Sequence, residues 1–226
     1  MKLRFTKPRL ENYWDNRSFG PFANNQVSQY FRDTVKLLNP ILGEINLEIG
    51  TGFGRMIPVY ERLGVGYIGI EIDKRAARYS KQHYDHDIII GDMRCLPFRD
   101  RSFDSVLSVG AVEHVPETEL SLYEHLRVSK DKGKCMVLIL SLFSPFISFP
   151  MLRAMKRRYN GTDWQIHFGS RYTMKRIKQM LDRIHAQILF AQHIGISLPG
   201  RAELLLHPLD QWIGNAYVVQ YQRKGS

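Results

Sequence analysis

Three glycines at alternate positions follow a carboxylate near residue 50, and this spacing is suited to holding a small ligand. Glu48 is followed by Gly50, Gly52 and Gly54, and such a run predicts a tight turn with little side-chain bulk. The turn can bring a ligand against backbone amides at a helix N-terminus. A dinucleotide-binding turn requires a third glycine where this chain has Arg55. Glu48 would also repel a pyrophosphate, so the pattern favours a ligand with a positive group, such as an amino acid ammonium.

Two more carboxylates end the next two apolar runs of the chain. Glu71 closes the run that starts at Tyr67, about 20 positions after Gly50, where nucleoside-binding sheets place an acid against the ribose hydroxyls. A carboxylate can accept hydrogen bonds from both hydroxyls at once. Asp92 lies at the end of the third run, 86–93. Each acid alone could cap a helix or form a turn, but three in succession predict a ligand site at the ends of three strands.

Alternating strand and helix patterns must position these acids. The run 45–49 predicts a buried strand, and the helix expected over 55–63 tolerates Pro58 in its first turn and ends at Gly64. Asp73 is expected to cap a helix over 74–82. Further helices are predicted from Asn24 or Asn25 to 38, over 122–128 and over 173–184, and further strands within 67–73, 86–93, 103–109, 135–140, 187–193 and 215–222. Strands that alternate with helices indicate an α/β protein with a parallel sheet.

The acids and glycines together resemble a known family. The stretch 48–54 looks like motif I of the class I S-adenosylmethionine (SAM) dependent methyltransferases. Three later segments resemble the type 11 group of these enzymes, which includes quinone-biosynthesis enzymes: Gly-Asp at 91–92, Leu-Pro-Phe at 96–98 and Ser-Phe-Asp at 102–104. The resemblance implies a doubly wound, mostly parallel seven-stranded sheet with helices on both faces and an antiparallel last strand.

The resemblance also implies SAM as the cofactor and a role for each matched residue. Glu71 would bind the ribose, Ile72 would pack on the adenine, Asp92 would accept from the adenine amino group and Met93 would lie beside the ring. The full set of implied cofactor-binding residues is Glu48, Gly50, Thr51, Gly52, Gly54, Glu71, Ile72, Asp92, Met93 and Val109. The resemblance is good from about residue 40 to 141 and thin from 172 to 222.

The catalytic residue is not identified by the sequence, and His114 is the candidate nearest the methyl group by motif position. The family carries a similar Glu-His-Val-Pro stretch, here 113–116, beside the methionine end of the cofactor. The sequence has no Asp-Pro-Pro-Tyr, Asn-Pro-Pro-Tyr or Pro-Cys motif, which disfavours chemistry on nucleic-acid bases. We therefore expect methyl transfer to a small-molecule or lipid-like acceptor. An RNA methyltransferase and a non-catalytic SAM- or nucleoside-binding protein are the alternatives.

Length and composition bound the remaining expectations. The 226 residues, 44% of them hydrophobic, predict a single SAM-dependent methyltransferase domain over 1–226. It would have an N-terminal arm and helix in 1–40 and a variable acceptor lid in 142–170. No secretory signal is present at the N-terminus, and the apolar run 136–149 is too short and too interrupted to span a bilayer. A cytoplasmic protein is therefore expected. Neither cysteine has metal-binding spacing, so no metal is expected.

Positive charge suggests the chemistry of the partner. The net charge is +10, and Asp163 is the only acid among the many basic residues of the segment 153–178. Directly before that segment, 142–152 is dense in aromatic residues and prolines. An apolar wedge beside a cationic cluster would suit an apolar acceptor with an acidic group, or peripheral contact with an anionic membrane. A solvated helix face is the alternative interpretation. The oligomeric state is not predicted.

Overall fold

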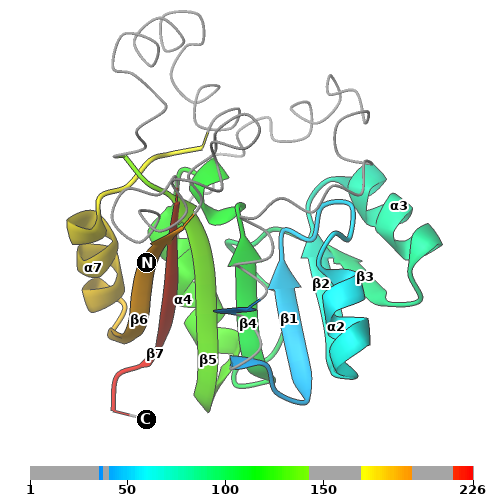
Figure 1. The fold of residues 1–226 in the computed structure, drawn as a ribbon, viewed down its shortest axis with the longest axis horizontal. Helices are drawn as coiled ribbons and strands as arrows, with labels where there is room; N and C mark the ends of the chain where they lie inside the picture. The colour runs from blue at the N-terminus through cyan, green and yellow to red at the C-terminus, as the bar shows by residue number, and fades with distance from the viewer. Residues whose placement is uncertain (1–35, 38–40, 143–168, 195–215, 226) are drawn as a thin grey trace, which may run out of the picture.

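The computed structural model of the protein describes residues 36–37, 41–142, 169–194 and 216–225. Within these residues, seven strands form one sheet in the order β3-β2-β1-β4-β5-β7-β6 (Figure 1). The strands are β1 (Ile45–Ile49), β2 (Gly66–Glu71), β3 (Asp87–Ile90), β4 (Phe103–Val109), β5 (Ser129–Leu140), β6 (Ala186–Ile194) and β7 (Ala216–Arg223). The helices are α2 (Ile57–Leu63), α3 (Lys74–His83), α4 (Thr118–Val128) and α7 (Met174–Arg183), with a 3-10 turn η4 (Val112–His114).

The sheet confirms the predicted doubly wound class. β1 pairs in parallel with both β2 and β4, and β3 and β5 extend the sheet in parallel on the two sides. β7 lies antiparallel between β5 and β6, as the family resemblance implied. The chain therefore reverses its direction of winding at β1, and the loops after β1 and β4 leave the sheet at this reversal point, where doubly wound proteins bind ligands.

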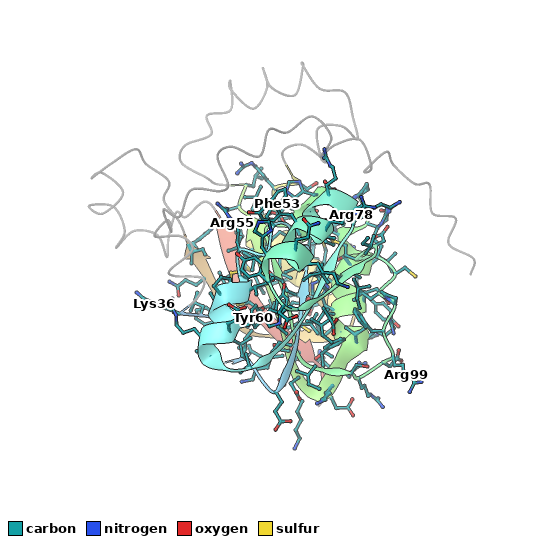
Figure 2. All side chains as sticks on the ribbon, turned by 90° about the vertical axis from the view of Figure 1, so that its right-hand side faces the viewer. Lys36, Phe53, Arg55, Tyr60, Arg78 and Arg99 are labelled. Atoms are coloured by element: carbon teal, nitrogen blue, oxygen red, sulfur yellow. The ribbon has the colours of Figure 1, made fainter. Side chains whose placement is uncertain are left out.

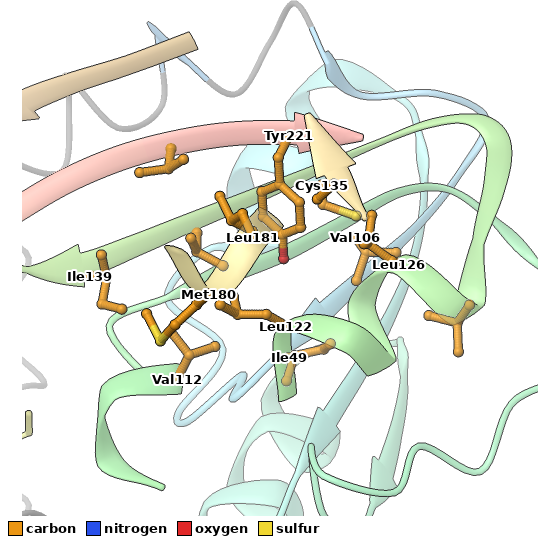
Figure 3. Packing of buried hydrophobic residues seen from close by; sticks show 14 of the residues in the cluster. Ile49, Val106, Val112, Leu122, Leu126, Cys135, Ile139, Met180, Leu181 and Tyr221 are labelled. Atoms are coloured by element: carbon orange, nitrogen blue, oxygen red, sulfur yellow. The ribbon is translucent and has the colours of Figure 1, made fainter. Parts of the chain in front are cut away.

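Helices cover both faces of the sheet, each over its own apolar layer. On one face, Tyr60 of α2 and Ala77 of α3 pack with Leu107, Met136 and Val218 of the sheet. On the other face, residues of α4 and α7 pack against the sheet (Figure 3). That second layer includes Leu122, Leu126, Met180, Leu181, Val106, Cys135 and Tyr221. Burial of such layers is the main stabilising term of the fold.

Side chains and glycine determine where three helices begin or end. The Asp73 carboxylate accepts from the backbone N–H groups of the first turn of α3, and the Thr173 hydroxyl does the same for α7. Both caps satisfy amides that have no partner within the helix. Gly64 ends α2 in the left-handed conformation, with φ of 65°. The predicted starts and the predicted stop are confirmed.

One strand begins earlier than the sequence indicated. We predicted a strand over 135–140 with a connection before it, but β5 starts at Ser129, which pairs with Phe103. The register then shifts, so that Lys134 pairs with Ser105. The intervening polar residues interrupt the regular pairing, and Gly133 lies against Ser129 and the backbone of Lys130 with no room for a Cβ. Polar residues in this stretch have no apolar alternation, and this hid the start of the strand.

Several predictions fall mainly outside the described residues. Lys36 and Leu37 are helical, and the rest of the predicted N-terminal arm and helix is not described. Of the predicted lid 142–170, only Leu142, Gly169 and Ser170 are described. The single-domain organisation over 1–226 therefore stays a prediction. In the described part of the chain, no helix is both long and apolar enough to cross a membrane.

Candidate cofactor-binding edge

The strand register brings the predicted acids to one edge of the sheet. Ile49, the last residue of β1, pairs with Ile70 in β2 and with Ser108 in β4. Glu71 ends β2 opposite Ile90, the last residue of β3. Because these four strands are parallel, their carboxyl ends form one row. The glycine turn, Glu71, the loop with Asp92 and the turn after β4 all leave the sheet from this row.

The three glycines of the turn have different surroundings. A Cβ on Gly50 (φ 75°) would collide with the Cβ of Ala111, and one on Gly54 (φ 75°) would lie 2.8 Å from the Tyr84 ring. Gly52 (φ 56°) has no heavy atom within 4 Å of the place where a Cβ would be. Gly50 and Gly54 therefore allow the protein to pack on itself, whereas Gly52 leaves open space next to the backbone. That space is a cradle in which a ligand could lie.

The backbone amides of the turn are not bare, and this corrects the sequence argument. The N–H groups of Gly50 and Thr51 donate to the Ile70 carbonyl at 2.9 and 3.2 Å, and the Gly54 N–H donates to the Thr51 carbonyl. The Gly52 N–H donates to Glu71 Oε2 at 2.7 Å. The end of β2 thus uses the amides that a ligand would otherwise contact. The turn offers open space rather than free donors.

The Glu71 carboxylate closes the turn and keeps acceptor capacity. Its Oε2 accepts from Gly52 and its Oε1 accepts from the Asp73 N–H at 2.9 Å. Burial raises the pKa of Glu71, and the hydrogen bonds from backbone N–H groups oppose that rise. The backbone N–H of Ile72 also bonds this carboxylate. A carboxylate has about four acceptor positions, so about one remains for a ligand hydroxyl.

The Glu48 carboxyl lies inside the protein rather than on the open side of the turn. It is 3% exposed, and its Oε2 accepts from the Tyr67 hydroxyl at 2.7 Å. The same hydroxyl lies 3.3 Å from Thr51 Oγ1. Burial raises the pKa of Glu48 to about 8, with a further rise from the Glu71 charge. A nearby ammonium would favour its ionised form, and the predicted contact with an ammonium group stays a prediction.

The Asp92 carboxylate is half-buried and is held by Arg94. The Arg94 guanidinium donates from Nη2 to Asp92 Oδ2 at 2.7 Å and from Nη1 to Glu117 Oε2 at 2.7 Å. Burial opposes ionisation of Asp92, but the hydrogen bonds from the Arg94 side chain and backbone outweigh it and lower the pKa of Asp92. Asp92 is therefore an acceptor at neutral pH.

Apolar predicted residues lie close to this edge. A Cβ on Gly50 would lie 4.0 Å from Met93 Cε, so Met93 adjoins the glycine turn. Ile72 is half-buried directly after Glu71, and Val109 is half-buried as the last residue of β4. Phe53 lies at the end of the molecule toward which β1 points (Figures 1 and 2), with its ring edge-to-face with that of Tyr79.

The turn after β4 contains the predicted candidate His114 and a residue that the sequence reasoning passed over. His114 is half-buried, and its backbone N–H donates to the Ala111 carbonyl. The neighbouring Glu113 is 1% exposed, and its Oε2 has no hydrogen-bond partner among the residues that the structure describes. Burial raises the pKa of Glu113 to about 8, while the backbone N–H of Glu113 and the charge of Arg171 oppose the rise. A buried carboxyl next to a ligand edge is a candidate proton-transfer group. The family-like stretch 113–116 contains Glu113, but only His114 was predicted from it as a candidate.

Sequence reasoning also missed Arg94 and Tyr67. The Asp-x-Arg spacing of residues 92 and 94 was a usable signal, because an Asp side chain commonly bonds the N–H two residues later. No local signal indicated Glu117 as the second partner of Arg94. Within the described residues, no group of three or more His, Cys, Asp or Glu side chains is placed to hold a metal ion. The expected absence of a metal stays a prediction.

The edge combines two carboxylate acceptors with apolar surface and open space. Glu71 and Asp92 supply the acceptors, Met93 adjoins the glycine turn, and the backbone at Gly52 borders the open space. The sheet order, the glycine turn after β1 and the acids that follow β2 and β3 define a Rossmann-like methyltransferase fold.

Comparisons with known proteins agree with this class. Residues 47–137 match the family model described as a methyltransferase domain, of the type 11 group. Residues 47–137 thus match a type 11 methyltransferase domain, as the resemblance predicted. A SAM-dependent methyltransferase of known structure from Thermotoga maritima has the same fold, with a TM-score of 0.60 and 20% identity over 84% of this chain and 87% of that one.

Curated relatives match about half of the chain. A demethylmenaquinone methyltransferase from Renibacterium salmoninarum is 31% identical over 124 residues, which are 54% of this chain and 52% of that protein. A ubiquinone biosynthesis O-methyltransferase from Rhodopseudomonas palustris is 27% identical over 125 residues, which are 53% of this chain and 49% of that protein. The chain thus spans about half the length of the curated relatives that it matches.

Proposed function

We propose that this protein transfers a methyl group from SAM to a small-molecule or lipid-like acceptor. The observation that carries the proposal is the pair of carboxylates at the ends of two neighbouring parallel strands, at the same edge as the open turn at Gly52. Glu71 is the last residue of β2, and Asp92 comes just after β3. A cofactor with two ribose hydroxyls and an amino-substituted ring needs acceptors of this kind. The match of residues 47–137 to methyltransferase domains supports the same activity.

Each residue of the edge would have a separate role. Glu71 would accept from the ribose hydroxyls, Asp92 would accept from the adenine amino group, and Ile72 and Met93 would flank the ring. When bound, SAM supplies a methyl group that is already activated on a sulfonium. The protein therefore has mainly to orient the acceptor, and orientation of this kind can contribute about 7–11 kcal/mol. The buried edge after β4, with Glu113 and His114, would exclude water there.

Relatives guide the proposal for the acceptor. Two of them are quinone-biosynthesis methyltransferases by name, and quinone precursors are apolar rings with hydroxyl or acidic groups. Arg171 places a cation at the end of β5, because its Nη1 donates to the carbonyl of Ser141, the residue directly after that strand. An apolar acceptor with an acidic group would be compatible with this side of the sheet. The remaining basic residues of 153–168 lie outside the described residues.

A binding measurement and a product screen test the proposal. S-adenosylhomocysteine at about 100 times its dissociation constant should stabilise the fold by about 2.7 kcal/mol, whereas NAD at the same concentration should leave it unchanged. Mass spectrometry should then identify which of a panel of quinols, phenols, lipids, amines and RNA gains the mass of one methylene group. Identical melting with and without S-adenosylhomocysteine would refute the proposal. Binding without any methylated product would indicate a non-catalytic SAM-binding protein.

A further inference from the structure

Arg94 is the most buried cation at the candidate edge, and the proposed function assigns it no role. Its side chain is 3% exposed and lies between two carboxylates that face water more openly, Asp92 at 32% and Glu117 at 39% exposure. A guanidinium loses hydration when it is buried to this extent, and that loss is offset only where its N–H groups are paired. Both sides of the Arg94 fork are paired.

The hydrogen bonds from Arg94 fix the plane of the Asp92 carboxylate. Arg94 Nε lies 3.0 Å from Asp92 Oδ1 and 3.1 Å from Oδ2, and Nη2 lies 2.7 Å from Oδ2. The backbone N–H of Arg94 donates to Oδ1 as well, at 2.9 Å. Three N–H groups of Arg94 thus donate to Asp92, and the Nε–H is shared between the two oxygens. A carboxylate has about four acceptor positions, so three donors from the described residues leave about one position for a ligand.

The second partner of Arg94 anchors this arrangement to another element. Glu117 directly precedes α4, and its Oε2 accepts from Arg94 Nη1 at 2.7 Å. The guanidinium is thus held from both ends and cannot turn without losing one carboxylate. Two carboxylates against one cation also leave the cluster with an excess of negative charge. Such a cluster attracts an N–H donor and repels a carbonyl oxygen.

We propose that Arg94 is a positioning and specificity-determining residue, which holds Asp92 so that its one remaining acceptor position selects an amino group, and not a carbonyl, on the purine ring. This inference rests on the proposed function, because it takes Asp92 as the residue that meets the adenine ring. The new element is that the selectivity depends on Arg94. Asp92 on a free loop would present either oxygen, and in its protonated form it could also donate to a carbonyl.

Two substitutions at Arg94 separate charge from geometry. Arg94→Lys keeps the positive charge but loses the planar fork that bonds both carboxylate oxygens. Arg94→Met keeps the apolar length and loses the charge. In Arg94→Met, burial would act on Asp92 with no opposing cation, so the pKa of Asp92 should rise.

The test compares two ligands that differ at one position of the purine. S-adenosylhomocysteine carries the amino group, and S-inosylhomocysteine carries a carbonyl oxygen in its place. By calorimetry, the wild type should prefer the amino ligand by about 10- to 100-fold, the range expected for one hydrogen bond to a charged group. Both Arg94 variants should lose affinity for the amino ligand, keep their affinity for the carbonyl ligand, and so lose most of the preference.

A pH series adds a measurement that a merely structural role would not change. Between about pH 8 and pH 5, Asp92 stays ionised in the wild type, and titration of the nearby Glu48, Glu71 and Glu113 affects the wild type and the variants alike. Relative to the wild type, the affinity of Arg94→Met for S-adenosylhomocysteine should fall further as the pH falls, because Asp92 takes up a proton.

Arg127 provides a matched control in the same chain. It also bonds two carboxylates, with Nε 2.7 Å from Glu124 Oε1 and Nη1 2.7 Å from Asp100 Oδ1, and it also connects α4 to the segment after β3. It belongs to the last turn of α4, the end opposite Glu117. Arg127→Lys should lower the melting temperature and leave the preference between the two ligands intact.

The outcomes are distinguishable. A wild type that binds neither ligand overturns the proposed function. A wild type that prefers the amino ligand, with the same preference in both Arg94 variants, leaves the function standing and overturns the inference. An equal loss for both ligands in the Arg94 variants would also overturn it, because Arg94 would then support only the fold. Loss of preference in Arg127→Lys would show that any damage near α4 has this effect, and the inference would fail.

Discussion

Glu71, the proposed acceptor for the ribose hydroxyls, also supports the glycine turn, since its oxygens already accept from Gly52 and Asp73. Replacement by alanine would therefore disturb the turn together with the site. Glu71→Gln keeps the size but turns one acceptor into an N–H₂ donor. We expect its affinity for S-adenosylhomocysteine to fall about tenfold or more, measured by calorimetry, because one hydroxyl of the ribose loses its acceptor.

The control for this prediction is the neighbouring acid. Asp73→Asn should keep the affinity of the wild type, because asparagine also caps helices well and Asp73 acts through the first turn of α3. Unchanged ligand affinity in Glu71→Gln would remove Glu71 from the proposed binding set.

His114 is a second residue with a testable role. It lies in η4, half-buried, next to the buried carboxyl of Glu113. We expect His114→Gln to keep methyl transfer within about tenfold once the acceptor is known, whereas removal of a general base costs about 10²- to 10⁴-fold. The measurement is the initial rate at saturating SAM. A large loss in His114→Gln would contradict a structural role, and a large loss confined to Glu113→Gln would transfer the role to its neighbour.

At the scale of elements, two glycines allow the cost of backbone strain to be measured apart from the cost of steric crowding. One lies in the glycine turn and the other at the end of α2. Gly50 and Gly64 both have a left-handed backbone, with φ of 75° and 65°. A Cβ on Gly64 would meet no heavy atom within 4 Å, whereas one on Gly50 would overlap Ala111. Gly64→Ala should therefore cost about 1–2 kcal/mol of unfolding free energy, the strain of a left-handed L-residue, and should leave ligand binding unchanged.

Gly50→Ala should cost more than Gly64→Ala in the same urea titrations. The added methyl must displace η4 or the end of β1, and both belong to the candidate edge. We expect this variant to lose binding of S-adenosylhomocysteine as well. Equal unfolding free energies for the two variants would mean that the contact between Gly50 and Ala111 can relax without cost.

At the scale of the whole molecule, two buried carboxyls make stability depend on pH. Burial raises the pKa values of Glu48 and Glu113 from 4.5 to about 8. Between these values the unfolded chain releases protons that the folded protein keeps, so the folded state binds more protons. The contribution of these two carboxyls to the unfolding free energy is therefore fully present below the ordinary carboxyl pKa. It decreases as the pH rises and stops decreasing above about pH 8.

The double variant Glu48→Gln with Glu113→Gln tests this dependence. The wild type should lose unfolding free energy between about pH 7 and pH 8, by at most about 1.4 kcal/mol per pH unit for each carboxyl. The variant should show a flatter profile in urea titrations. Buried His125 titrates below pH 7 in the folded protein, where burial lowers its pKa to about 4, and in the unfolded chain, where its pKa is about 6.5. A wild-type stability that rises between pH 7 and pH 8 would contradict the prediction.

Local patterns determined the elements of this protein and their order. The strand after residue 44, the stop at Gly64, the cap at Asp73 and the acids that follow three strands were all predictable, because each depends on neighbours within one turn or one strand. The direction of β7 came from the family resemblance, since periodicity cannot tell parallel from antiparallel pairing. The early start of β5 was missed, because the polar residues at the register shift show no apolar alternation.

Tertiary structure alone decided which side chains share the edge. The partner of Glu48 is Tyr67, the turn amides bond to Ile70 and Glu71, and Arg94 connects Asp92 to Glu117. All of these contacts except the one between Arg94 and Asp92 join residues from different elements. The sequence around one partner therefore gives no indication of the other. The burial of each acid is likewise decided by the tertiary structure. Glu113 and Glu117 are both acids beside the same turn, but packing buries the first and leaves the second half-exposed, so only the folded chain gives them different chemistry.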